Sequence, residues 1–188
     1  MALSKKKAPG VDPREVELKF RIPPGSRAAL EASPALAAAA PRRHHQVTTY
    51  FDTPDHLLDR TGLTLRVRRS GGTYTQTVKS RANCGGVATR RSEWEWRIGQ
   101  DEPDVGQLAE TRALAMAATA IKDRLEPVFV TDIRRTTRLL HLDDNTVAEA
   151  AIDEGSIEAG PASEPICELE LGIGAQGRLH WTGVPACR

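Results

Sequence analysis

The feature that most constrains this sequence is a short run near the N-terminus that reads Glu-Val-Glu-Leu-Lys over residues 15–19, followed by Phe20. Successive side chains of a β-strand point to opposite faces, so a strand here would place Glu15, Glu17 and Lys19 together on one face. Carboxylates and an ammonium group are costly to bury without partners. We therefore expect this face to line a wet cavity that holds a metal ion and a charged ligand.

The same alternation of charged and apolar residues recurs along the chain, between turns rich in Gly, Asp and Pro. It predicts eight strands, over residues 16–22, 46–51, 63–69, 73–80, 91–97, 129–142, 146–154 and 166–171. One long helix is expected over residues 108–125, where Ala, Leu, Met and Ile dominate. The predicted class is α+β and mainly β, an eight-stranded antiparallel sheet closed into a barrel with helices packed outside.

Composition excludes several classes of function. The 188 residues suffice for one sizeable domain, and 26 basic against 25 acidic residues give a net charge of +1, which argues against a general nucleic-acid coat. The sequence shows no apolar run long enough to cross a membrane and no signal-peptide core. Its three cysteines form no CxxC pair. We expect a cytoplasmic monomer or homodimer without nucleic-acid or membrane partners.

Sorting the predicted strands by parity gives two charged sets that would share the cavity. The basic set consists of Lys19, Arg66, Arg68, Lys79 and Arg91, and the acidic set of Glu15, Glu17, Glu93, Glu149, Asp153, Glu168 and Glu170. Guanidinium groups bind phosphate oxygens in pairs, and lysine acts as a point charge. Clustered carboxylates without His or Cys favour Mg²⁺ or Mn²⁺. Together the two sets indicate a site for a metal-bound polyanion.

The chain resembles the CYTH proteins, also called triphosphate tunnel metalloenzymes, whose hallmark is the ExExK pattern found at residues 15–19. The similarity continues in order through Tyr-Phe-Asp-Thr-Pro-Asp at 50–55, Leu-Arg-Val-Arg at 65–68, Thr-Val-Lys at 77–79, Arg-Ser-Glu at 91–93, Ile-Asp-Glu-Gly at 152–155 and Glu-Leu-Glu at 168–170. Within the family the chain is most similar to the bacterial inorganic triphosphatases, through residues 85–93 and 164–170.

The resemblance implies an eight-stranded tunnel and metal-dependent hydrolysis of tripolyphosphate to pyrophosphate and phosphate. By position, the implied phosphate-binding residues are Lys19, Arg66, Arg68, Lys79, Arg91 and Arg135. The implied metal ligands are Glu15, Glu17, Glu168 and Glu170, while Glu93 and Asp153 would help to hold metal or to place water. Lys79, Glu93 and Asp153 form the expected catalytic group. Alternation puts Arg135 on the face opposite Arg134 and Arg138, which leaves a bulge or a different arginine open.

The expected organisation is a flexible tail at residues 1–13, a tunnel domain at 14–171 and a divergent C-terminal segment at 172–188. Many bacterial relatives continue into a helical, histidine-rich, phosphate-binding domain named CHAD, and we expect a protein without it. Residues 172–188 are rich in Gly and lack the amphipathic helix expected there, so we expect a truncated, frame-altered or divergent terminus.

Other interpretations share these residues. The same tunnel would serve another CYTH activity on an organic triphosphate, such as an adenylate cyclase, a thiamine triphosphatase or a nucleoside triphosphatase. A polyphosphate-binding module without turnover is a third possibility. Taken alone, the run at 15–19 is better explained as a solvated strand face, and only its repetition across strands favours a tunnel. We expect Trp94 and Trp96 to pack in the core under a helix.

Overall fold

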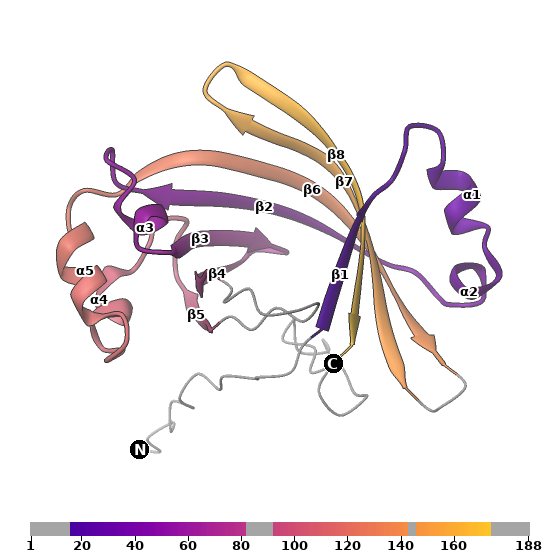
Figure 1. The fold of residues 1–188 in the computed structure, drawn as a ribbon, viewed down its shortest axis with the longest axis horizontal. Coiled ribbons are helices and arrows are strands. Elements are labelled where there is room, and N and C mark those ends of the chain that lie inside the picture. The colour runs from indigo at the N-terminus through magenta and orange to yellow at the C-terminus, as the bar shows by residue number, and fades with distance from the viewer. Residues whose placement is uncertain (1–15, 82–91, 143–145, 174–188) are drawn as a thin grey trace.

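The computed structural model describes residues 16–81, 92–142 and 146–173 of the chain (Figure 1). Eight strands and five short helices are found in this part. In chain order the elements are β1 (Val16–Arg21), α1 (Arg27–Glu31), α2 (Pro34–Ala37), β2 (Arg42–Asp52), α3 (Leu57–Arg60), β3 (Leu63–Ser70), β4 (Thr73–Ser80), β5 (Glu93–Ile98), α4 (Val105–Ala109), α5 (Ala115–Ile121), β6 (Glu126–His141), β7 (Val147–Ala159) and β8 (Ala162–Ile173).

All eight strands form one antiparallel sheet in the order β1-β8-β7-β6-β2-β3-β4-β5. The expected mainly-β class with eight antiparallel strands is therefore confirmed. Figure 1 shows the sheet bent into an arch, with the long strands β2 and β6 running along it. In the described part of the chain, β1 and β5 are the two ends of the sheet and no backbone ladder joins them. The described hydrogen-bond ladders therefore leave the arch open between β1 and β5.

The register of the sheet decides which side chains share a face, because directly opposed residues point the same way. Lys19 lies opposite Glu170 across β1 and β8, and Arg135 lies opposite Asp153 across β6 and β7. In the other half, Arg66 lies opposite Thr77, which in turn lies opposite Glu95. We call the face that carries these residues the charged face. Its strands come from every part of the chain.

The opposite, apolar face is covered by helices at both ends of the arch (Figure 1). At one end, Leu65 and Val78 of the sheet pack with Leu108, Leu114 and Ile121 from the α4 and α5 region. At the other end, Ile22 and Leu36 cover Ala150 and Ile152 of β7. Separating the two faces in this way lets the charged face stay polar without exposing the core.

Trp94 and Trp96 of β5 are partly buried and pack against the cluster of Leu65 and Val78. This placement confirms that they are core residues beneath the helices. The alternation of Glu93 and Glu95 with the two tryptophans therefore has a simple cause, since the glutamates of the same strand point to the charged face.

The single long helix expected over residues 108–125 is wrong, because the structure has two short helices, α4 and α5, with turns between them. Leu108 and Leu114 are both buried in the same cluster. Six residues apart on one continuous helix, they would point to widely different sides. Interrupting the helix near Thr111 lets both leucines reach the sheet, so tertiary packing overrides helix propensity here.

Gly155 is required by a close approach between β6 and β7. A Cβ atom at this position would lie 1.8 Å from the carbonyl oxygen of Asp132, so no other residue fits without moving the backbone. Gly155 lies two residues beyond Asp153 on the same strand and face, opposite Ile133. The glycine of the Ile-Asp-Glu-Gly run therefore holds β6 close to β7 beside the pair formed by Arg135 and Asp153.

We predict that Leu65→Ala destabilises the fold by about 2–5 kcal/mol, because Leu65 is fully buried between the sheet and the helices and its loss leaves a cavity. Urea unfolding followed by circular dichroism measures the change. Met116→Ala is the control, since Met116 is 88% exposed and its change in unfolding free energy should stay within about 0.5 kcal/mol. Equal losses in both variants would contradict the placement of this core.

Candidate functional site

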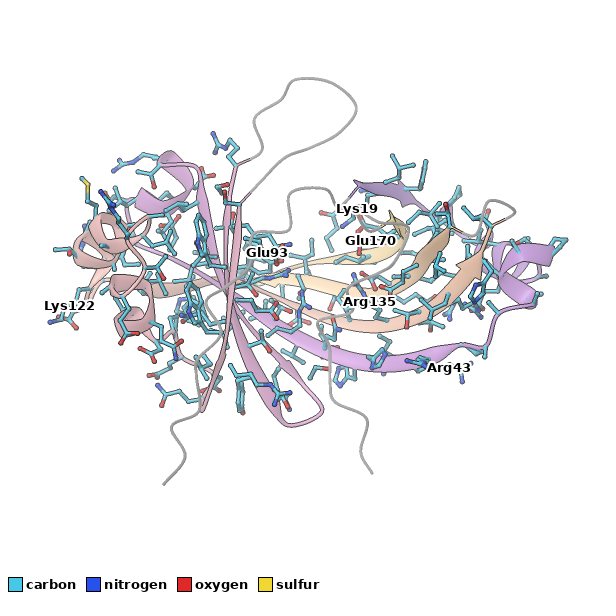
Figure 2. The ribbon with its side chains drawn as sticks, turned by 90° about the horizontal axis from the view of Figure 1, so that it is seen from below. Lys19, Arg43, Glu93, Lys122, Arg135 and Glu170 are labelled. Carbon is cyan, nitrogen blue, oxygen red and sulfur yellow. The ribbon has the colours of Figure 1, made fainter. Side chains whose placement is uncertain are left out.

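One half of the charged face carries a network of ion pairs built from β1 and β6 to β8. The Nζ atom of Lys19 lies 2.7 Å from a carboxylate oxygen of Glu168 and 3.2 Å from one of Glu170. Arg135 donates from Nη2 to Glu170 over 2.6 Å. Figure 2, seen from below the arch of Figure 1, shows Lys19, Glu170 and Arg135 lying together. Glu170 of β8 therefore bridges Lys19 of the adjacent strand β1 and Arg135 of β6, which reaches across β7.

Arg135 also forms a forked pair with Asp153. Its Nε donates to Oδ1 over 2.7 Å and its Nη2 to Oδ2 over 2.5 Å. Among the three arginines weighed for this position, Arg135 is the one on the charged face. Arg138 lies on the other face, where it donates to Glu31 of α1, and Arg134 is opposite Glu154. Side chains of β6 therefore alternate regularly along its pairing with β7, and no bulge is needed to place Arg135 on the charged face.

The charges of this network shift the pKa values of its members. Burial by itself would raise the pKa of Glu170, but the charges of Arg135 and Lys19 outweigh burial and hold it below its usual value. Burial would lower the pKa of Lys19, yet its hydrogen bond to Glu168 and the charge of Glu170 raise it. Both groups are therefore firmly ionised at neutral pH. The pKa of Glu149 is raised, mainly by burial.

The other half of the charged face presents two half-buried arginines of β3, Arg66 and Arg68. Among residues 16–81, 92–142 and 146–173 neither of them finds an ion-pair partner, and the Nε atoms of both are buried there without a hydrogen-bond partner. Burial, together with repulsion from Arg66 and Arg135, lowers the pKa of Arg68 to about 10. Desolvated cations that repel each other destabilise the empty site, and a bound anion would relieve that cost.

Lys79 and Glu93 face each other on β4 and β5 next to these arginines, with Nζ and a carboxylate oxygen 3.1 Å apart. Figure 2 places Glu93 apart from the group of Lys19, Glu170 and Arg135. Burial and the charge of Glu93 raise the pKa of Glu95, while Arg68 and Arg66 oppose the rise. Sequence reasoning missed Glu95, although its parity with Glu93 on a strand that alternates with tryptophan could have found it.

Most of the expected site residues lie on the charged face in the described part of the chain. They are Lys19, Arg66, Arg68, Lys79, Glu93, Arg135, Asp153, Glu168 and Glu170. Glu15 and Arg91 lie outside the described residues. The backbone of Glu17 belongs to β1 and lies opposite Gly172, two residues from Glu170, while its side chain lies outside the described part.

The donor set on the charged face fits a hard divalent cation, since its members are carboxylates without His or Cys. Within residues 16–81, 92–142 and 146–173, no three acidic, His or Cys side chains converge closely enough to hold a metal ion. Glu168 and Glu170 are instead paired with Lys19 and Arg135. A metal would therefore have to compete with these cations, or bind together with an anion that draws them away.

A model of the CYTH domain matches residues 13–178. The chain belongs to the CYTH domain family. The inorganic triphosphatase of Haemophilus influenzae is 31% identical over 161 residues, which cover 84% of this chain and 44% of that protein. The CYTH chain thus spans less than half the length of this curated relative.

A solved structure from Hippeastrum shares the fold of this CYTH domain. That protein was proposed as an adenylyl cyclase and has a dominant triphosphatase activity. It matches with a TM-score of 0.54 at 20% sequence identity, over 85% of this chain and 79% of that chain. At this identity the likeness establishes the fold. Within the CYTH domain as described, no helix is long and apolar enough to cross a membrane.

We predict that Glu95→Gln makes the ligand-free protein more stable at pH 8 and that the gain shrinks as the pH falls toward 4.5, the ordinary pKa of a glutamate. A carboxyl whose folded pKa is raised destabilises the folded state when it is ionised, and this cost disappears once both states are protonated. Urea unfolding at pH 8 and pH 5 measures the difference.

Glu102→Gln is the control for this prediction, because Glu102 is an exposed glutamate away from the charged face. Its unfolding free energy should differ little from wild type at either pH. A loss of stability in Glu95→Gln at pH 8 would show that the attraction of Arg66, Arg68 and Lys79 outweighs burial, contrary to the raised pKa.

Proposed function

We propose that this chain hydrolyses inorganic tripolyphosphate to pyrophosphate and phosphate on the charged face, with Mg²⁺ or Mn²⁺ as cofactor and in the cytoplasm. The observation that carries the proposal is the pair of half-buried arginines Arg66 and Arg68, which form no ion pair within the described part of the chain. Arg66 and Arg135 also repel Arg68. A short chain of phosphates offers many oxygens to several guanidinium groups at once. The name of the Haemophilus influenzae relative supports the same substrate.

In this proposal, cations from several strands bind the phosphate groups of the substrate. Arg66 and Arg68 bind phosphate from β3, Lys79 from β4 and Arg135 from β6, with Lys19 at the end of the sheet formed by β1. Arg91, which lies outside the described residues, is proposed to join them. These groups would stabilise the negative charge on the transferring phosphoryl group in the transition state.

Four glutamates are proposed to hold the metal: Glu168 and Glu170 of β8, with Glu15 and Glu17 at the start of the chain. When bound, the metal would polarise a phosphoryl oxygen and lower the pKa of the attacking water. Glu93 is proposed to orient that water, because it lies beside Lys79 and interacts with Glu95, whose carboxylate also interacts with Arg66 and Arg68. Glu95 shares that strand and face and would support the same role.

Phosphate release from tripolyphosphate tests the proposal, with ATP, thiamine triphosphate and pyrophosphate measured alongside in Mg²⁺ and in Mn²⁺. We expect release from tripolyphosphate and no release after chelation of the metal. Production of cyclic AMP from ATP with tripolyphosphate untouched would instead assign an organic triphosphate as substrate. Tight binding of tripolyphosphate without any release above the blank would make the chain a binding module.

We predict that Arg68→Ala lowers kcat/KM for tripolyphosphate by about 100-fold or more, since the transition state loses a cation that is prepositioned and desolvated. Arg69→Ala is the matched control, because the neighbouring Arg69 is exposed and points to the opposite face. Its steady-state kinetics should match wild type. A similar loss in both variants would mean that general charge, not the charged face, attracts the substrate.

We predict that Lys19→Ala mainly raises KM, whereas Glu170→Ala mainly lowers the metal-dependent rate. Lys19 would contact the substrate in both ground and transition states, while Glu170 would act through the metal. Steady-state kinetics across a range of Mn²⁺ concentrations separates the two effects. Unchanged kinetics in both variants would contradict the assignment of this half of the site.

A further inference from the structure

Asp153 is the most enclosed carboxylate of the ion-pair network on the charged face. Its side chain is only 8% exposed, compared with 16% for Glu170 and 26% for Glu168. Both of its oxygens already accept hydrogen bonds, Oδ1 from Nε of Arg135 and Oδ2 from Nη2 of the same residue. The two residues are directly opposed across β6 and β7. Arg135 thus engages both oxygens of Asp153.

This arrangement suits a metal ligand poorly. Mg²⁺ usually keeps several of its waters when it binds a protein, which needs open space around each ligating oxygen. Moving Asp153 onto a metal would also leave the largely buried guanidinium of Arg135 with one carboxylate fewer, and breaking a buried pair is costly. Glu168 and Glu170 are more exposed, and one of their partners is the half-exposed Lys19. They can therefore change partners more cheaply.

The forked pair fixes the plane and direction of the guanidinium of Arg135. Two parallel hydrogen bonds give orientation as well as energy, which a single bond would not. They use Nε and Nη2 and leave Nη1 outside the pair. On the same face of β7, the flanking residues are Ala151 and Gly155, which are small. The arginine can therefore reach across β7 to Glu170 on β8 without a bulky side chain in the way.

We propose that Asp153 is a positioning residue that holds Arg135 toward the phosphates of the substrate, and that it is not a metal ligand. The inference rests on the proposed function, because it assigns a task within that site. It replaces the role expected for Asp153 from family resemblance, where the residue would hold metal or place water.

Two binding titrations without turnover separate the alternatives. Calorimetry measures Mn²⁺ binding in the absence of tripolyphosphate, and tripolyphosphate binding in the presence of a chelator. The variants are Asp153→Asn, Arg135→Lys and the double variant, with Glu168→Gln as the control for a proposed metal ligand. In Asp153→Asn an amide N–H₂ would face the donors of Arg135, so one bond of the fork is lost and the guanidinium is no longer fixed.

We expect Asp153→Asn and Arg135→Lys each to weaken tripolyphosphate binding by about tenfold, the effect of losing one charge-assisted hydrogen bond. The double variant should bind hardly more weakly than either single variant, because both changes break the same pair. Mn²⁺ affinity should change less than threefold in these variants and fall clearly in Glu168→Gln. Unfolding curves check that each variant is folded, and Asp153→Glu replaces Asp153→Asn if the latter fails to fold, with the same expected loss.

A loss of Mn²⁺ affinity in Asp153→Asn that Arg135→Lys does not share would overturn the proposal and make Asp153 a ligand. Strictly additive losses in the double variant would overturn it as well. If wild-type protein binds tripolyphosphate and Asp153→Asn binds it equally well, the positioning role fails while the proposed function stands. If wild-type protein binds no tripolyphosphate at all, the proposed function fails and this inference fails with it.

Discussion

The central physical constraint on this structure is the repulsion among the arginines on the charged face of the bent sheet. Arg66 and Arg68 project from β3 and Arg135 projects from β6, and burial together with repulsion from Arg66 and Arg135 lowers the pKa of Arg68 to about 10. In bulk water such repulsion would be weak, but burial strengthens it. The protein tolerates this cost because the opposite face of the same sheet is packed under helices at both ends. The packed apolar face stabilises the fold, and the repelling arginines on the charged face destabilise it.

The two halves of the charged face carry their charge in different ways. In the half built from β1 and β6 to β8, every cation of the network has a carboxylate partner. In the half built from β3 to β5, Lys79 is paired with Glu93, while Arg66 and Arg68 form no ion pair with any residue that the structure describes. This asymmetry suggests an order of events in the proposed reaction. An anion would be drawn first to the unpaired arginines, and the metal and the anion would then separate the remaining pairs by binding the acidic and the basic members respectively.

Much of this arrangement was predictable from the sequence because a strand has a period of two. Once Leu65 and Val67 are assigned to the core, Arg66 and Arg68 must point the other way. The same reasoning placed Trp94 and Trp96 under the helices, and it could have included Glu95. The choice of Arg135 among its neighbours needed the register of β6 against β7, since parity alone separates faces without saying which face is which.

Other features were beyond sequence reasoning for physical reasons. The break between α4 and α5 follows from the need to bury both Leu108 and Leu114 against a curved sheet, and helix propensity carries no information about that surface. The forked pair of Arg135 and Asp153 joins residues 18 positions apart and depends on how closely Gly155 lets two strands approach. Long-range partner choice of this kind is fixed by packing, so the role of Asp153 could be read only from the folded chain.

The most direct test of this account is a crystal structure of the protein with Mn²⁺ and a non-hydrolysable imido analogue of tripolyphosphate. The account predicts phosphate oxygens within hydrogen-bond distance of both Arg66 and Arg68 on the charged face, with the metal held by glutamates of β8. An analogue bound elsewhere, with these two guanidinium groups still without a partner, would contradict it.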